Sequence, residues 1–435
     1  MSHEPETVRF PRVVWDDFAM RAALCGLTAC FLWFTVAIPH LSGSLEDVPA
    51  LIICPVAGLV VAVALHLLAY RVSTRYRRLG LAVLGSTLLF AGLGLMAVTG
   101  QAWPVSFGLF SVGLFLSLPS LAPKLLVLPA ATEHEPDLLA RARQFQTRYT
   151  TVFTYVGLAA NVPPVATRLF HAYGGTIPDV VAPVAFWYMV VLSAAVCVWC
   201  WMWFTRPLVE LCLEPVARLL YRVQARGAER LPPFGPCLVI ANHAFWFDPC
   251  ILGVVLPRPI TPIMTQRFYD QWFLKPLLKG VFRVIVVPET PIKRETPELD
   301  QAVAALDRGE VVVIFPEGYL RRKEETPLRR FGQGVWRILS ARPDTPVVAC
   351  WVEGGWGSKF SYKDGPPTKN KPMDFRRPIH LAVSAPVVVP PGVLADQMAT
   401  RVHLMNRVAE MRTALGLSPL PPFEVTRVEG HEEPA

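Results

Sequence analysis

Charged residues are scarce in this chain of 435 residues: they make up 17% of it, whereas hydrophobic residues make up 52%. A soluble globular protein carries about 25% charged residues. The shortage excludes a chain that is soluble throughout and predicts a part embedded in a membrane. The formal net charge of +8 suits an anionic membrane face. No nucleic-acid-binding module is recognisable, so we expect no nucleic-acid partner.

Cysteines with the spacing of a disulfide framework are also missing. The nine cysteines are an odd number without regular spacing, which favours a reducing compartment. Cys197 and Cys200 form a C-x-x-C pair inside an apolar run, so we interpret them as packing residues rather than metal ligands. Acidic residues such as Glu4 and Glu6 open the chain without a small-residue cleavage site, so we do not expect a cleaved signal peptide.

Long apolar runs fill the first half of the chain. Roughly 20 apolar residues cross a bilayer as a helix. Runs near this length occur at 20–42, 49–70, 79–99, 104–128, 149–170 and 183–204. The run over 79–99 contains no charged residue at all. We therefore predict a transmembrane helical bundle of about six helices over residues 1–205.

The loops between these runs differ in basic charge. Lysine and arginine gather after the second and fourth runs, at Arg71, Arg75, Arg77, Arg78, Lys124, Arg141, Arg143 and Arg148. The loops near 43–48 and 100–103 contain neither residue type. Because cytoplasmic loops carry the excess of basic residues, we expect an integral membrane protein with both termini and the following domain on the cytoplasmic side.

The composition changes after residue 205. Residues 206–224 alternate charged and apolar positions at helical spacing, which predicts an interfacial helix within a linker over 206–228. Short apolar runs then predict strands at 237–241, 284–287, 311–315 and 346–352, and amphipathic segments predict helices at 265–280, 296–308, 331–341 and 396–415. This alternation indicates an α/β domain with a mixed or parallel sheet over 229–417. The Pro- and Glu-rich residues 418–435 predict a disordered tail.

A polar motif follows the first of these predicted strands. Asn242 and His243 come directly after LVIA, and Asp248 and Pro249 complete the pattern N-H-x-x-x-x-D-P. Catalytic groups gather at the C-terminal ends of strands in α/β domains. A carboxylate on one imidazole nitrogen fixes the tautomer and makes the other nitrogen a better base. Taken alone, the motif fits a strand-end histidine with Asp248 as a helix cap at least as well.

A second motif, Phe315-Pro316-Glu317-Gly318, follows another predicted strand, and Glu317 stands 74 residues after His243. Gly318 permits a close approach of the backbone to a ligand. Basic residues come next, at Arg321, Arg322, Lys323, Arg329 and Arg330. Arginine suits a phosphate headgroup because its guanidinium binds in a bidentate way. Alone, such a run is also typical of a solvated surface.

The two motifs together, IANHAFWFDP and VVIFPEG, resemble the glycerolipid acyltransferase family typified by lysophosphatidic acid acyltransferase, over roughly 210–395. The resemblance implies that His243 and Asp248 are catalytic. It further implies an acceptor-binding set, namely Phe315, Pro316, Glu317, Gly318, Arg321 and Arg322. The implied donor is acyl-CoA or acyl carrier protein, with neither a metal nor a bound cofactor. The stretch EGGWGSKFS at 353–361 resembles a segment of acyltransferase domains fused to multi-span membrane regions.

The chain departs from the family pattern at two places. The family often continues FPEG with Thr-Arg-Ser, whereas Tyr319 and Leu320 precede Arg321 and Arg322 here, so either arginine can take the family arginine's place. The arginine of another family block has no clear counterpart, and the candidates are Arg283, Lys293 and Arg294. These departures weaken the expectation of lysophosphatidic acid as acceptor, but not that of acyl transfer.

The sequence thus predicts a membrane-bound O-acyltransferase of phospholipid biosynthesis or remodelling, related to 1-acylglycerol-3-phosphate O-acyltransferases. A His–Asp pair would activate the hydroxyl of a lysophospholipid, and membrane lipids would be its partners. Two alternatives stay open. In one, the chain is a multi-span lipid or solute transporter with a cytoplasmic lipid-binding regulatory domain. In the other, the enzyme acylates an alcohol without a phosphate.

Overall fold

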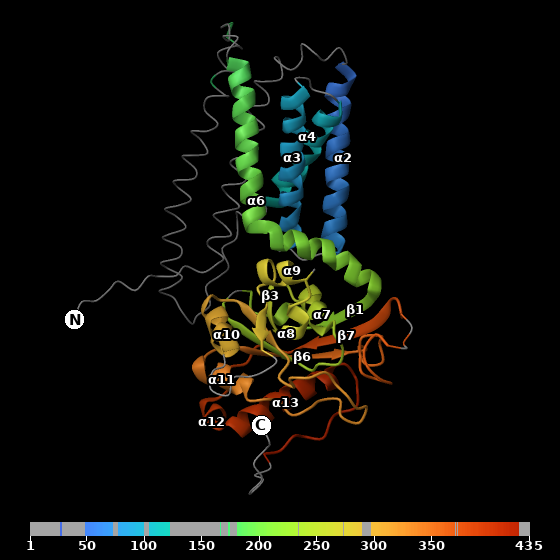
Figure 1. Cartoon of the computed structure of the whole chain (residues 1–435), viewed down its shortest axis with the longest axis vertical. Coiled ribbons are helices and arrows are strands. Elements are labelled where there is room, and N and C mark those ends of the chain that lie inside the picture. Colours follow the sequence, from blue (N-terminus) through green and yellow to red (C-terminus); the bar gives the residue numbers. More distant parts are fainter. Residues whose placement is uncertain are drawn as a thin grey trace, which may run out of the picture. The chain divides into compact units, whose positions relative to one another are not determined.

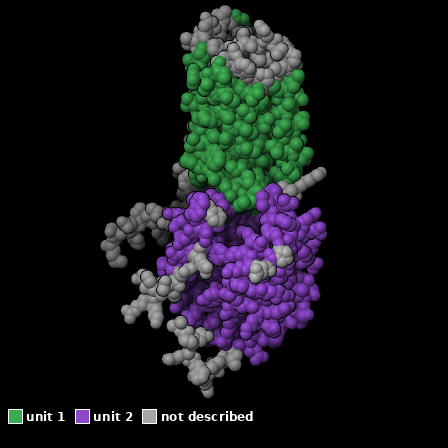
Figure 2. Space-filling model, turned by 45° about the vertical axis from the view of Figure 1, so that its right-hand side comes forward, with its two compact units in different colours: residues 1–213 green, residues 214–435 purple. Residues whose placement is uncertain are grey.

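The computed structural model describes residues 27, 48–72, 77–99, 104–121, 166, 173–174, 181–233, 235–272, 274–288, 297–369, 371 and 373–425. The chain divides into two units, residues 1–213 and 214–435 (Figure 2). The predicted spans 20–42 and 149–170 lie outside the described residues, apart from Leu27 and Ala166. The basic loop after the fourth run lies outside them as well.

The first unit is helical where it is described (Figure 1). Its helices are α2 (Val48–Val72), α3 (Gly80–Thr99), α4 (Pro104–Leu121) and the part of α6 (Val181–Leu220) up to Leu213, with η1 (Arg77–Leu79) before α3. Ile53–Tyr70, Arg77–Thr99 and Pro183–Leu220 are long and apolar enough to cross a membrane, and Val105–Ser117 is a shorter apolar helix. These helices confirm a helical region with three apolar candidate spans, at the predicted runs 49–70, 79–99 and 183–204, whereas the helix described at 104–128 is shorter than predicted.

Small residues line the contact between α3 and α4. A Cβ atom on Gly92 would stand 2.6 Å from the backbone nitrogen of Phe110, and one on Gly113 would stand 2.3 Å from that of Leu89. The two backbones therefore touch where side chains are absent. Close contacts of this kind are typical of helices that pack against each other in lipid.

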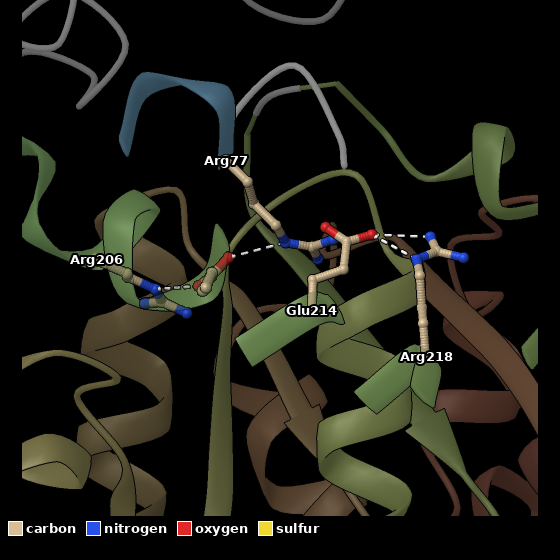
Figure 3. A network of polar contacts seen from close by, with 5 residues as sticks. Arg77, Arg206, Glu214 and Arg218 are labelled. Atoms are coloured by element: carbon tan, nitrogen blue, oxygen red, sulfur yellow. Dashed lines mark hydrogen bonds and ion pairs between the residues drawn. The ribbon is translucent and has the colours of Figure 1, made fainter. Parts of the chain in front are cut away.

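A buried ion cluster joins η1 to α6 within the first unit. Glu210 accepts hydrogen bonds from Arg206 at 2.7 Å and from Arg77 at 3.4 Å. The side chains of Arg77 and Arg206 are 2% and 7% exposed. Figure 3 draws this cluster, and it also draws the ion pair of Glu214 and Arg218, which belongs to the second unit.

The second unit is built on a seven-stranded sheet in the order β1-β7-β6-β2-β5-β3-β4 (Figure 1). The strands are β1 (Tyr221–Arg226), β2 (Cys237–Ala241), β3 (Ile260–Thr265), β4 (Ile285–Val287), β5 (Val311–Ile314), β6 (Val347–Glu353) and β7 (Arg377–Val383). Neighbouring strands are parallel except for β6 and β7, which are antiparallel. The sheet is therefore mixed, as the sequence predicted.

Helices cover both faces of this sheet. They are α7 (Asp248–Val255), α8 (Gln266–Tyr269), α9 (Lys275–Gly280), α10 (Pro297–Asp307), α11 (Gly334–Ala341), α12 (Pro391–Leu394) and α13 (Gln397–Ala414). Along β2, Leu238 and Ile240 join the core that includes α10, α11 and α13, whereas Val239 joins the core that includes α7. Because both faces of the sheet are buried, the sequences of its central strands are continuous apolar runs.

Two predicted helices differ from the structure. A separate helix was predicted over 206–224. In the structure, residues 206–220 are the last part of α6, and residues 221–226 form β1. Tyr221 is buried while Arg222 is exposed, an alternation that belongs to a strand. The helix predicted over 265–280 is also wrong, because residues up to Thr265 belong to β3 and α8 and α9 are separate.

The tail predicted to be disordered is ordered in its first part. Phe423 donates its backbone N–H to Asn406 Oδ1 at 2.9 Å, and its carbonyl accepts from Asn406 Nδ2 at 3.1 Å. Leu420 and Phe423 also pack on the core beside α13. Disorder is therefore contradicted for 418–425, and residues 426–435 lie outside the described part of the chain.

Candidate active site

The two sequence motifs meet at one edge of the sheet. Strands β2 and β5 are parallel neighbours, with Ile240 opposite Ile314, so the residues that follow them emerge side by side. The backbone N–H of His243 donates to Glu317 Oε1 at 2.8 Å, and that of Arg321 donates to the His243 carbonyl at 2.8 Å. Sequence reasoning placed both motifs at strand ends, and the fold brings them into direct contact.

His243 and Asp248 form a hydrogen-bonded pair. Asp248 begins α7, and its Oδ2 lies 2.8 Å from His243 Nδ1. The same oxygen accepts the backbone N–H groups of Ala244 at 2.7 Å and Phe245 at 3.0 Å. Burial raises the pKa of the Asp248 carboxyl, opposed by the bonds to His243 and to the two amides. The turn between the two residues thus holds the carboxylate against the imidazole.

The His243 ring is held on one side and open on the other. It stacks on Phe315, with ring centroids 4.2 Å apart, and its side chain is 20% exposed. Because Nδ1 contacts the Asp248 carboxylate, we assign the ring hydrogen to Nδ1, from which it is donated to Asp248. This tautomer leaves a lone pair on Nε2. Within the described residues Nε2 has no hydrogen-bond partner. This arrangement can accept a proton from a ligand.

Asn242 fastens the end of β2 to β6. Its Nδ2 donates to the Val352 carbonyl at 2.9 Å, and its Oδ1 accepts the Val352 N–H at 2.7 Å. The side chain is buried. The sequence motif includes this residue without indicating a role, and the two bonds show that it positions the strand end on which His243 stands.

Glu317 is tied to the backbone through both of its oxygens. Oε1 accepts from His243 N–H and Oε2 accepts from Arg329 N–H, each at 2.8 Å. Burial raises the pKa of the Glu317 carboxyl to about 8. The sequence resemblance assigns this residue to acceptor binding. The structure places it in the framework, where it joins three segments around His243.

The other residues of the FPEG motif form a tight turn. Gly318 donates its N–H to the Phe315 carbonyl at 3.0 Å, and its φ of +72° lies in the left-handed region that strains other residues. The Pro316 carbonyl accepts the N–H of Gly332 at 2.7 Å. The turn therefore carries Phe315 to the imidazole and anchors the segment that contains Gly332.

The two arginines that the sequence left as alternatives have different surroundings. The Arg321 guanidinium donates to the carbonyls of Lys323 and Glu324 and lies 4.5 Å from the ring centroid of Trp356. It is 8% exposed, and burial lowers its pKa. Arg322 is exposed, with its guanidinium 3.5 Å from the ring centroid of Tyr362.

Arg283 lies at the N-terminal ends of the parallel strands, whereas the two motifs meet at the C-terminal ends. It precedes β4 and pairs with Glu310 at 3.8 Å, and Glu310 directly precedes β5. Because β5 and β2 are parallel, this pair is a strand length away from His243. Lys293 and Arg294, the other candidates, lie outside the described residues.

The loop after β6 covers the turn that holds Asp248. Trp246 N–H donates to the Phe360 carbonyl at 3.1 Å, and Phe245 bridges to Ser361. This loop is the EGGWGSKFS stretch, whose glycine-rich composition was its signal in the sequence. In the described part of the chain, no group of three histidine, cysteine or carboxylate side chains is placed to hold a metal ion.

Comparison with known proteins matches residues 222–353 to the Acyltransferase family model. Uncharacterized proteins of Mycobacterium tuberculosis and Mycobacterium bovis are each 29% identical over 161 residues, covering 35% of this chain and 42% of theirs. An uncharacterized protein of Mycobacterium leprae is 25% identical over 146 residues, covering 31% and 37%. The matches thus span less than half the length of these relatives.

A solved structure is also similar to this chain. It is the crystal structure of the 1-acyl-sn-glycerophosphate acyltransferase PlsC from Thermotoga maritima. The TM-score is 0.39 at 18% sequence identity, over 50% of this chain and 83% of that one.

Proposed function

Starting from the acyltransferase-family domain of residues 222–353, we propose that this chain transfers a fatty acyl group from a thioester to the hydroxyl of a lysophospholipid. The observation that carries the proposal is the 2.8 Å contact between His243 Nδ1 and Asp248 Oδ2 at the C-terminal edge of the sheet. General bases of this kind need the other ring nitrogen free for the substrate, and Nε2 meets that need.

The proposed reaction needs no side-chain nucleophile. Nε2 of His243 takes the proton from the acceptor hydroxyl as its oxygen attacks the thioester carbonyl. The tetrahedral intermediate then collapses, the carbon–sulfur bond breaks, and the imidazolium returns the proton to the leaving thiolate. Asp248 stabilises the transient positive charge on the ring and keeps the imidazole in the productive tautomer.

The apolar helices support lipid substrates. Three stretches of the first unit are long and apolar enough to cross a bilayer, and a diacyl product stays in such a membrane. The donor is proposed to be acyl-CoA or acyl carrier protein, and the acceptor a 1-acylglycerol-3-phosphate or another lysophospholipid. A cytoplasmic position of the site is the orientation that the basic loops predict.

The test uses membranes that contain the wild-type chain, His243→Ala or His403→Ala. His403 is a partly buried histidine on α13 and is the matched control. Labelled acyl-CoA is supplied with a panel of lysophospholipids, and the diacyl product is quantified by mass spectrometry. Loss of a general base lowers the rate by about 10²–10⁴-fold, so His243→Ala should lose product while His403→Ala keeps it.

Product formation that survives in His243→Ala would contradict the proposed mechanism. Absence of product from the wild-type chain with every donor and acceptor would contradict acyl transfer itself. The transporter alternative would then gain weight, because transport does not require His243.

A further inference from the structure

The structure separates the basic residues after the FPEG turn by how their side chains are used. The Arg321 guanidinium is committed to two backbone carbonyls and to the face of Trp356. A buried guanidinium with these partners stabilises the loop that contains it. The arginine nearest to the family pattern is therefore poorly placed to exchange its bonds for a ligand.

Arg329 is held beside His243 by the backbone. Its N–H and that of His243 bind the two oxygens of the same Glu317 carboxylate, each at 2.8 Å. A single carboxylate therefore bridges the two backbone N–H groups. This juxtaposition is absent from the sequence, where the two residues are far apart.

The segment around Arg329 is fixed on both sides. Leu328 and Phe331 are buried in the core, at 4% and 0% exposure, and Gly332 N–H donates to the Pro316 carbonyl at 2.7 Å. A side chain on such a rigid segment loses little backbone entropy when it binds a ligand.

The Arg329 guanidinium is available, in contrast to that of Arg321. The residue is partly exposed, and its guanidinium lies 5.6 Å from the ring centroid of Tyr319, which is 65% exposed. Within the described residues this guanidinium makes no ion pair with a carboxylate and no hydrogen bond. An arginine whose guanidinium makes no hydrogen bond, beside an exposed tyrosine, offers several donors to an oxyanion.

We propose that Arg329, with Tyr319 beside it, binds the phosphate of the acceptor lipid and so sets the preference for phosphorylated acceptors. This inference rests on the proposed acyl transfer. A phosphate monoester near the base would place the acceptor hydroxyl within reach of Nε2. CoA also carries phosphates, so the experiment must separate the two sources.

The experiment uses the purified full-length chain in lipid nanodiscs. KM and kcat are measured for lysophosphatidic acid and for monoacylglycerol with the same acyl chain, and KM is also measured for acyl-CoA. The variants are Arg329→Gln, Arg329→Lys and, as the matched control, Arg337→Gln, which removes an exposed arginine on α11. Arg329 binds Glu317 through its backbone, so the Gln variant should unfold at the wild-type temperature.

Hydrogen bonds to a charged group contribute about 1.5–3 kcal/mol, so Arg329→Gln should raise KM for lysophosphatidic acid about 10- to 100-fold. Arg329→Lys keeps the charge and should recover part of this loss. KM for monoacylglycerol and for acyl-CoA should stay at the wild-type value, and Arg337→Gln should match the wild type throughout.

Three results would overturn the inference while leaving acyl transfer intact. They are an unchanged KM for lysophosphatidic acid in Arg329→Gln, an equal rise for monoacylglycerol, or a rise for acyl-CoA alone. A wild-type chain that acylates neither acceptor would overturn the proposed function and this inference with it.

Discussion

Both units have a buried apolar core, but the helices of the first unit also expose many large apolar side chains. In the helical unit, large apolar residues such as Val60 and Val191 are 62% and 67% exposed, while Ser117 and glycines fill the contacts between helices. In the α/β unit, residues such as Val239 and Phe331 are fully buried. Burial of large apolar side chains is driven by water. Their outward position in the helical unit fits a hydrocarbon surrounding.

The carboxylate of Glu210 in the helical unit also differs from the two buried carboxylates that contact His243. In the helical unit, Glu210 faces the guanidinium groups of Arg77 and Arg206. In the α/β unit, Asp248 and Glu317 are held mainly by backbone N–H groups. Opposite charges neutralise each other and anchor helices, whereas carboxylates held by the backbone keep a histidine in place. Only the second arrangement leaves a reactive atom free for a substrate.

The largest effect on stability is expected from Glu210→Gln. Removal of one partner from a buried ion pair costs about 3–5 kcal/mol, and here two buried guanidinium groups lose the carboxylate that they share. The matched control is Glu410→Gln on α13, whose bond to Arg407 has the same length of 2.7 Å as that of Glu210 to Arg206. Glu410 is 53% exposed and Glu210 is 10% exposed, and a surface pair contributes about 0–1 kcal/mol.

The measurement is the midpoint of thermal unfolding of the detergent-solubilised chain. Glu210→Gln should lower it clearly, and Glu410→Gln should leave it nearly unchanged. Equal shifts for the two variants would mean that burial does not distinguish these ion pairs.

The next largest difference between the two units is expected when aspartate replaces an exposed valine in each of them. Val60 lies midway along α2, and aspartate at the centre of a membrane helix costs about 2.5–3.5 kcal/mol. Val388 in the α/β unit is 44% exposed, and aspartate there meets water. Val60→Asp should reduce the carbonate-resistant membrane fraction, whereas Val388→Asp should not. An undiminished membrane fraction for Val60→Asp would argue against lipid around this face of α2.

The sequence predicted those parts of the fold that have a strong local pattern. The uncharged run at 79–99 forms α3, and β2 spans the predicted residues 237–241. The strand was predictable because burial on both faces of a sheet leaves an unbroken apolar run. The contact between His243 and Asp248 follows from the sequence, because a strand end followed by a short turn confines both residues. Their contact is local in the chain.

The missed parts depend on partners that are distant in sequence. Strands β1 and β7 pair with each other across the chain, and β1 begins where a helix ends, so helical spacing of its charges was misleading. The ligand-binding role of Glu317 and Arg321 stays a prediction, but the sequence did not indicate their contacts within the framework. Their bonds to His243, Lys323 and Glu324 exist only after the β5 turn has folded against β2. Residue type alone therefore did not predict these framework contacts.

The smallest effect is expected from two glycines on the same helix. In Gly92→Ala the new Cβ would stand 2.6 Å from both Phe110 N and Ser106 O of α4, whereas Gly94 has no atom within 4 Å of that position. Forcing α3 and α4 apart should cost about 1–3 kcal/mol, and alanine in an open helical position gains about 0.5–1 kcal/mol over glycine. Thermal unfolding midpoints in detergent should therefore shift down for Gly92→Ala and slightly up for Gly94→Ala. Shifts of the same sign would mean that helix propensity, rather than contact between backbones, governs this part of the helical unit.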